Sequence, residues 1–395
     1  MWMLLVVIAA VACTPWVASA QTIYPLDRAE ILAGARFDLK VEFPPGEMPP
    51  SDAAVSINGK PVAEVLGKAP VFVAGADLRS PSAMWVRDAV VRTPGQYRVE
   101  VRRGDVSKVV SWQVFGAPEA KARNVIVFIG DGLSNAHRVA ARMLAKGIRE
   151  GRYGGELAID DMPHMALVST AGSDSIITDS ANSMSAYMTG HKTCVNAMGV
   201  YCASGRTEGD HPHVEPMGLL ARRLGNKAIG IVTTVEVWDA TPAAVVAHTR
   251  SRANRDGIVA SMLAAAPEVV LGGGSAQFLP QPLGARRDGI DYLAKFGAAG
   301  YPIVATAGEL VDRVAKPDTH RLLGLFHAGA MDGALDRRYL HKGSVARYPE
   351  QPDLVDQTEA ALRVLERAPN GFFLMIEVRL DRPLRAHAGL GAVGL

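Results

Sequence analysis

The stretch Ile176–Gly190 carries the side chain best suited to act as a nucleophile. In it, Thr178, Asp179 and Ser180 are short oxygen-bearing residues that accept hydrogen bonds from the unpaired N–H groups of a helix's first turn. Apolar residues then recur every three or four positions, and a glycine ends the stretch. We therefore expect Ser180 at a helix N-terminus, where the helix dipole favours an alkoxide or a bound anion. The alternative is a surface helix that Ser180 merely caps.

Two carboxylates follow apolar runs that are typical of buried strands. Asp131 comes after residues 125–129, and Glu377 comes after residues 372–376. The carboxyl ends of parallel strands are where open α/β sheets bind ligands, and oxygen ligands suit Mg²⁺. Both residues are therefore candidate metal ligands. Taken alone, an Asp between two glycines, such as Asp131, is more often a turn residue.

A third group of polar residues lies in the middle of the chain. Asp239 and Thr241 open an expected helix, and Arg252 follows shortly afterwards. The planar fork of an arginine matches two oxygens of a phosphate. A serine nucleophile, an arginine clamp and metal-binding oxygens are the components of phosphoryl transfer, which depends on positioning and charge neutralisation.

The elements that must position these residues alternate between strand and helix. Continuous apolar runs predict parallel strands that are covered on both faces. These runs are residues 125–129, 228–234, 269–271, 322–326 and 372–376, and residues 353–368 form a clear amphipathic helix. The fold class expected is α/β, with a mostly parallel sheet and helices on both faces.

The beginning of the chain has a different character. Short alternating runs separated by Pro- and Gly-containing turns occupy residues 21–116 and predict a small antiparallel β-sandwich. No candidate active-site cluster occurs there, so we interpret it as an accessory domain. Residues 117–123 form the expected linker to a catalytic domain at 124–395.

Composition and the first residues bear on location. The formal net charge of +2 and the absence of long basic runs argue against nucleic-acid binding. Residues 1–12 are wholly apolar, and Ala18-Ser19-Ala20 follows, which predicts a cleaved export signal over residues 1–20; a lipid on Cys13 is the weaker alternative. No stretch is long enough for a stable membrane span. In an oxidising compartment we expect Cys194 and Cys202 to form a disulfide, with two free thiols as the alternative.

With these motifs in register, residues 124–377 resemble the alkaline phosphatase family. The matching segments are Phe128–Gly132, Thr178–Ala181, Asp239–Ala244 with Arg252, Leu271–Gly274 and Gly371–Glu377. The resemblance implies a phosphomonoesterase that uses Mg²⁺ and Zn²⁺ and forms a phosphoserine on Ser180. It further implies phosphate binding by Arg252 and metal binding by Asp131, Thr241 and Glu377. Small phosphate monoesters would be the ligands, and a homodimer remains open.

The resemblance stops after Glu377. The family continues with an Asp and a His that bind zinc, and later with an Asp-His pair and a last His. Here Asp381, the candidate for that zinc-binding Asp, is one place early, Arg385 stands where the first His is expected, and His387 is two places late. We interpret this ending as a truncation or a shift in reading frame. The zinc sites should then be incomplete and the activity impaired.

Two other functions compete with this one. The first is an inactive phosphate-binding or structural fragment, in which Arg252 and the helix at Ser180 still hold an anion. The second is a sulfatase-like or phosphodiesterase member of the same superfamily, which the Thr178-Asp179-Ser180 motif disfavours.

Overall fold

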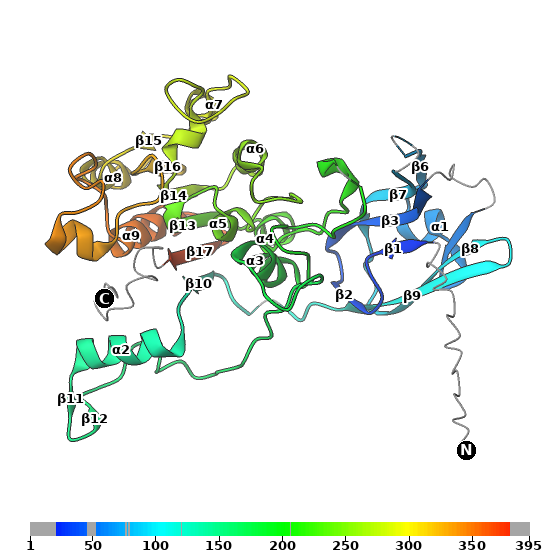
Figure 1. Cartoon of the computed structure of the whole chain (residues 1–395), viewed down its shortest axis with the longest axis horizontal. Coiled ribbons are helices and arrows are strands. Elements are labelled where there is room, and N and C mark those ends of the chain that lie inside the picture. The colour runs from blue at the N-terminus through cyan, green and yellow to red at the C-terminus, as the bar shows by residue number, and fades with distance from the viewer. Residues whose placement is uncertain are drawn as a thin grey trace, which may run out of the picture.

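The computed structural model describes residues 21–45, 53–75, 77, 80–119, 121–205 and 207–379. Two bodies follow one another along the chain (Figure 1). The first contains strands β1–β9, and the second contains a parallel sheet with helices on both sides. Within the described residues no helix is long and apolar enough to cross a membrane. The predicted signal segment at 1–20 lies outside this range.

The first body is a sandwich of two sheets that share one apolar core. In the first sheet the strand order is β1 (Thr22–Tyr24), β3 (Arg36–Pro45), β7 (Pro81–Val90) and β6 (Val71–Val73). In the second sheet the order is β2 (Ala29–Leu32), β9 (Val106–Phe115), β8 (Gly95–Arg103), β4 (Ala54–Ile57) and β5 (Lys60–Pro61). The short helix α1 (Val62–Leu66) follows β5 in the chain. Phe37 and Trp112 meet edge to face between the sheets. One pair, β2 with β9, is parallel, which the expectation of a wholly antiparallel sandwich did not include.

The second body is built on a six-stranded sheet in which every pairing is parallel. Its order is β10 (Val125–Asp131), β17 (Phe372–Arg379), β13 (Ala228–Glu236), β14 (Val269–Gly273), β16 (Leu322–Leu325) and β15 (Ile303–Val304). The inner strands are apolar along most of their length because both of their faces are covered. This arrangement confirms the predicted α/β fold class.

Helices cover the two faces of this sheet. One face packs against α3 (Ser180–Thr189), α5 (Ala240–Ala243), α6 (Arg255–Ala265) and α7 (Tyr292–Ala298). The opposite face packs against α8 (Ala307–Val314) and α9 (Leu354–Leu365). Helix α4 (Met217–Gly225) lies beside α3. Short 3₁₀ turns occupy Glu208–Asp210 and Ser275–Phe278, and a π turn occupies Asp336–Leu340.

Strand β10 differs from its prediction. We expected both faces of residues 125–129 to be buried, but β10 is the edge strand of the described sheet and Phe128 is 65% exposed. The chain that follows it, with α2 (Asn135–Lys146) and the hairpin β11 (Ile148–Arg149)–β12 (Arg152–Tyr153), extends away from the sheet (Figure 1). The apolar run at residues 125–129 therefore predicted a strand correctly, but it did not predict that the side chains of this strand are partly exposed to solvent.

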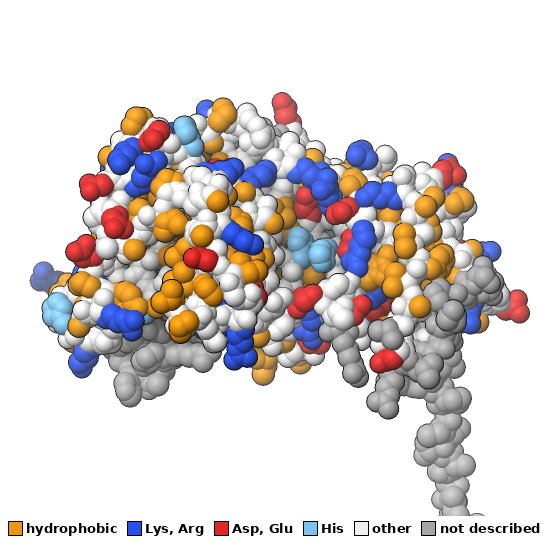
Figure 2. All heavy atoms as spheres, turned by 90° about the horizontal axis from the view of Figure 1, so that it is seen from above, with side chains coloured by type: hydrophobic (Ala, Val, Ile, Leu, Met, Phe, Trp, Pro, Cys, Tyr) orange, Lys and Arg blue, Asp and Glu red, His pale blue; other side chains and the backbone are white. Residues whose placement is uncertain are grey.

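The sandwich contacts the loop that precedes α4. Phe37 in β3 forms a β-bridge with Val214, and Asp38 accepts hydrogen bonds from the backbone N–H of His213. The buried ion pair of Lys40 and Glu42 lies nearby, at 2.5 Å between Nζ and Oε1. These contacts fix the loop against β3. Figure 2 shows histidine side chains on the surface at this junction.

Candidate active site

Helix α3 presents Ser180 in its first turn. Asp179 is the N-cap: it has extended backbone angles (φ −124°, ψ 175°), and its side chain accepts a hydrogen bond from the N–H of Asn182 at 3.2 Å. The side chain of Asn182 in turn accepts from the N–H of Asp179, which completes a capping box. Because Asp179 caps the helix, the alternative in which Ser180 serves only as the cap is wrong. The Ser180 hydroxyl lies at the positive end of the helix dipole.

Arg252 contacts the Ser180 hydroxyl directly. Its Nη1 lies 3.1 Å from Ser180 Oγ and 3.1 Å from Asp179 Oδ2, and its Nη2 lies 2.5 Å from Asp239 Oδ1. Two carboxylates thus hold the guanidinium beside the candidate nucleophile. A phosphate placed at the start of α3 would meet both the arginine fork and the helix N-terminus.

A disulfide loop holds both the cap and the arginine. The structure joins Cys194 to Cys202, with 6.0 Å between their Cα atoms. Inside this loop the N–H of Asn196 donates to Asp179 Oδ1 at 3.2 Å, and the carbonyl of Asn196 accepts from the N–H of Arg252 at 2.7 Å. One backbone unit therefore connects the two charged groups that flank Ser180.

Glu377 is buried in the centre of the sheet. It lies on β17 opposite Thr233 of β13, and the Thr233 hydroxyl donates to Glu377 Oε2 at 2.6 Å. Within the described part of the chain, Glu377 Oε1 has no hydrogen-bond partner. Burial raises the pKa of Glu377 to about 7, although the hydroxyls of Thr233 and Thr241, which favour the charged form, oppose the shift. A buried carboxylate oxygen without a partner indicates a place for a cation or a water molecule.

Arg379 lies between two other predicted ligands. It pairs in register with Asp131 across β10 and β17, and its Nε is 3.6 Å from Asp131 Oδ2. Its Nη1 forms a short hydrogen bond with Asp239 Oδ2. The two oxygens of Asp239 therefore bind two different guanidinium groups, those of Arg252 and Arg379.

The structure thus brings most of the predicted residues together at the carboxyl ends of the strands. They are Asp131, Ser180, Asp239, Thr241, Arg252 and Glu377. The remaining predicted metal ligand, Asp381, lies outside the described residues. Sequence reasoning gave no role to Thr233, Arg379 or Asn196. The period of two along a strand could have indicated Arg379, because it places this residue on the same face as Glu377.

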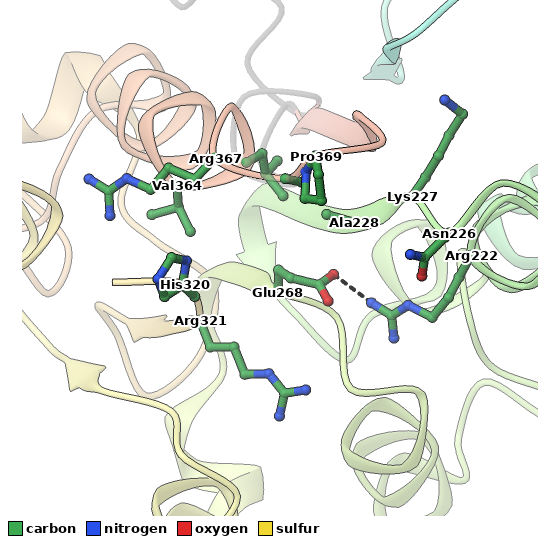
Figure 3. A pocket seen from close by; sticks show the side chains of 12 residues that line it. Arg222, Asn226, Lys227, Ala228, Glu268, His320, Arg321, Val364, Arg367 and Pro369 are labelled. Carbon is green, nitrogen blue, oxygen red and sulfur yellow. Dashed lines mark hydrogen bonds and ion pairs between the residues drawn. The ribbon is translucent and has the colours of Figure 1, made fainter. Parts of the chain in front are cut away.

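A cavity lies at the amino ends of the strands, on the opposite side of the sheet from the candidate site. Its volume is about 420 Å³, and several cations line it (Figure 3). Arg222 binds the carbonyls of Ala265 and Ala266 and the carboxylate of Glu268, while Arg367 binds carbonyls that include that of Val314. These cations stabilise the carboxyl ends of α6 and α8. The cavity therefore has a structural explanation, and the candidate active site remains at the carboxyl edge.

Comparison with known proteins decides the family. A family profile described as alkaline phosphatase matches residues 122–390. Alkaline phosphatase H of Pseudomonas aeruginosa (strain UCBPP-PA14) is 31% identical over 312 residues, which cover 69% of this chain and 63% of that protein. The chain belongs to the alkaline phosphatase family. It spans less than two thirds of the length of this relative.

Solved alkaline phosphatases share the fold. The crystal structure of the Thermus thermophilus alkaline phosphatase is 32% identical in sequence and superposes with a TM-score of 0.56. The match covers 68% of this chain and 51% of the Thermus chain. A mutant TAB5 alkaline phosphatase with Mg bound in the M3 site is 25% identical, with a TM-score of 0.51 and coverage of 65% and 64%. The predicted resemblance is therefore confirmed at the level of family and fold.

The residues of this alkaline phosphatase family chain fit a metal only in part. The unpartnered oxygen of Glu377, close to Thr241, suits a hard cation such as Mg²⁺. The space between Asp131 and Asp239 already contains the charged group of Arg379. Among the described residues no cluster of three or more His, Cys, Asp or Glu side chains is arranged to hold a metal.

Proposed function

We propose that this chain binds phosphate monoesters and hydrolyses them through a phosphoserine on Ser180. The observation that carries the proposal is the 3.1 Å contact between Arg252 Nη1 and Ser180 Oγ at the first turn of α3. A nucleophile and an anion-binding fork are adjacent there, and the positive end of the helix dipole adds to the attraction for phosphate.

The proposed reaction has two displacements at phosphorus. In the first, Ser180 Oγ forms a bond to phosphorus while the ester oxygen departs as an alkoxide, and the serine proton reaches the alkoxide through solvent. In the second, water attacks the phosphoserine, releases inorganic phosphate and restores the Ser180 hydroxyl. Arg252 would hold two phosphoryl oxygens in both steps by exchanging its contacts with Asp179 and Asp239 for contacts with substrate.

Glu377, Thr241 and Asp131 are the residues that would hold a divalent cation, which we propose to be Mg²⁺. When bound, such a cation stabilises an alkoxide and the charge on phosphoryl oxygens. We propose that zinc binding is incomplete and activity low, because the described residues contain no cluster of three or more His, Cys, Asp or Glu side chains arranged to hold a metal.

Replacement of the nucleophile tests the proposal. We expect Ser180→Ala to abolish turnover of a chromogenic phosphate ester, since the covalent step requires the hydroxyl. Ser183→Ala is the matched control, because Ser183 belongs to the same helix and its hydroxyl bonds the carbonyl of Asp179. Equal kcat for Ser180→Ala and the unaltered protein would refute the role of Ser180.

A phosphate-binding protein without turnover is the second candidate. Four ion pairs hold the guanidinium groups of Arg252 and Arg379 between carboxylates. The positive charge of the two arginines is therefore already partly neutralised, which favours this candidate because less charge is left to stabilise a transition state. Binding of inorganic phosphate, together with no ester hydrolysis above that of Ser180→Ala, would distinguish it from the enzyme.

Several expectations about the whole protein remain proposals. We propose that residues 21–116 and 124–395 are separate domains joined by 117–123, and that the chain is exported to the periplasm or secreted. The apolar residues 1–12 and the bonded Cys194 and Cys202 support export. A homodimer also remains a proposal.

A further inference from the structure

Arg379 occupies a position where a fixed positive charge has large consequences. It lies on β17 two residues beyond Glu377, so both side chains point to the same face of the sheet. Its backbone is held in place, because its N–H donates to Thr234 Oγ1 at 3.2 Å. The Arg379 side chain is only 17% exposed, and the side chains of its partners Asp131 and Asp239 are 17% and 12% exposed.

The guanidinium of Arg379 connects two carboxylates that come from different elements. Asp131 ends β10 and Asp239 is the N-cap of α5, and Arg379 contacts one oxygen of each. The remaining oxygen of Asp239 is bound by Arg252 at 2.5 Å. A metal ion that used Asp239 as a ligand would therefore have to displace one of these two arginines.

Arginine is a persistent competitor of a metal ion. Its guanidinium cannot be deprotonated in a protein, so it cannot vacate the space by losing its charge as a lysine can. Two like charges within a few ångströms repel strongly in a partly buried site, where water screens them poorly. Arg379 must therefore swing away before a divalent cation can enter between Asp131 and Asp239.

We propose that Arg379 is a resident organic cation that excludes divalent metal from the space between Asp131 and Asp239. Any metal is then confined to the side of the site where Glu377, Thr241 and Asp131 lie, away from Asp239. The exclusion of metal by Arg379 does not depend on the proposed phosphate site. One consequence does rest on that proposed function: the negative charge of a bound phosphoryl group would be neutralised by two arginines, Arg252 and Arg379, rather than by Arg252 and a second metal ion.

Metal binding by variants of the full chain tests the proposal. Mn²⁺ is the probe, because it accepts oxygen ligands as Mg²⁺ does and the unbound ion can be counted by electron paramagnetic resonance. We expect Arg379→Gln to gain about one equivalent of bound Mn²⁺, or at least a tenfold increase in affinity. Arg379→Lys keeps a positive charge and should show a smaller gain, while Arg379→Gln with Asp131→Asn should lose the gain.

Matched controls separate local from general effects. Arg102→Gln removes one arginine that binds Glu100 in the sandwich and should leave Mn²⁺ binding unchanged. Equal Mn²⁺ binding by Arg379→Gln and the unaltered protein, or an equal gain in Arg102→Gln, would overturn the proposal. Arg379→Met provides a second neutral replacement if the glutamine variant unfolds, as judged by circular dichroism.

The same measurement in a Ser180→Ala background separates this inference from the proposed reaction. The Mn²⁺ gain of Arg379→Gln should persist there, because Ser180 is not among the contacts of Arg379. Loss of the gain in that background would refute the assignment of the metal to Asp131 and Asp239. Retained turnover in Ser180→Ala would refute the proposed reaction without affecting the Mn²⁺ result.

Discussion

Thr233 donates a 2.6 Å hydrogen bond to Oε2 of Glu377 between two adjacent parallel strands, and both residues are fully buried. The bond partly compensates for the removal of an acidic group from water, which is otherwise costly. It also fixes Oε2 of the carboxylate, whose other oxygen, Oε1, has no hydrogen-bond partner among the described residues. The Thr233–Glu377 pair is therefore a structural support for the candidate cation position.

Removal of this hydroxyl should be costly. We expect Thr233→Val, which keeps the shape of the side chain, to lower the free energy of unfolding by about 1–3 kcal/mol because Glu377 loses a buried donor. Thr358→Val is the control: the Thr358 hydroxyl bonds the carbonyl of Leu354 within α9, and its loss should cost less. Urea denaturation of both variants gives the comparison. Equal losses would contradict a special role for Thr233.

Phosphate affinity should depend on the shape of the Arg252 side chain as well as its charge. Arg252→Lys keeps a positive charge but cannot bind two phosphate oxygens in parallel, so we expect inorganic phosphate to bind about tenfold more weakly. Arg250→Lys is the control, since Arg250 lies two residues earlier and bonds the carbonyl of Val195. Calorimetric titration with phosphate measures both. An unchanged dissociation constant in Arg252→Lys would exclude bidentate binding.

The junction between the sandwich and the α/β body should be sensitive to acid. The ring of His248 stacks on that of His213 with 4.5 Å between centroids, and burial, together with the neighbouring His213, lowers the pKa of His248 to about 3. The hydrogen bond to the Val214 carbonyl and the charge of Asp38 act in the opposite direction.

The sign of the pH effect follows from this lowered pKa. Unfolded His248 takes up a proton near pH 6.5, whereas folded His248 resists protonation, so its stabilising contribution is complete above pH 6.5 and falls as the pH drops toward 3. Because the unfolded state binds one proton more than the folded state in this range, we expect a slope of about 1.4 kcal/mol per pH unit at most. His248→Gln should flatten this slope in urea denaturation, while exposed His320→Gln should not. The same slope in His248→Gln would show that other groups cause the acid sensitivity.

The sequence predicted the parts of the site that depend on strand ends and helix starts. Asp131 and Glu377 were expected there because apolar runs precede them, and Ser180 because cap residues surround it. The role of Thr233 could not be predicted, since a threonine inside a strand gives no sign of which residue lies beside it. The contact of Arg379 with Asp239 joins β17 to α5 across a long separation in sequence, and only the assembled sheet creates it.

The fold shows a similar division. Local patterns were enough to predict the sandwich and the alternation of strands and helices, because side-chain periodicity and turn residues depend only on residues close together in the sequence. The exposure of Phe128 depends instead on the order of strands, with β10 at the edge of the described sheet. The parallel pairing of β2 with β9 likewise depends on segments far apart in the chain.

The last prediction concerns the disulfide loop. Its backbone at Asn196 binds both Asp179 and Arg252, so constraining the loop should position the two groups beside Ser180. Replacing Cys194 and Cys202 by serine removes the restriction on the unfolded chain, which the chain-entropy model values at about 2–3 kcal/mol for so short a loop. We expect the double serine variant to lose this amount of unfolding free energy and to bind phosphate severalfold more weakly.

Asn196→Gly is the control for this prediction. Asn196 has a φ of 68°, so the glycine variant keeps both backbone contacts without strain and should bind phosphate normally. Unchanged phosphate affinity in the double serine variant, measured by calorimetry below its unfolding temperature, would show that the disulfide stabilises the chain without positioning Arg252.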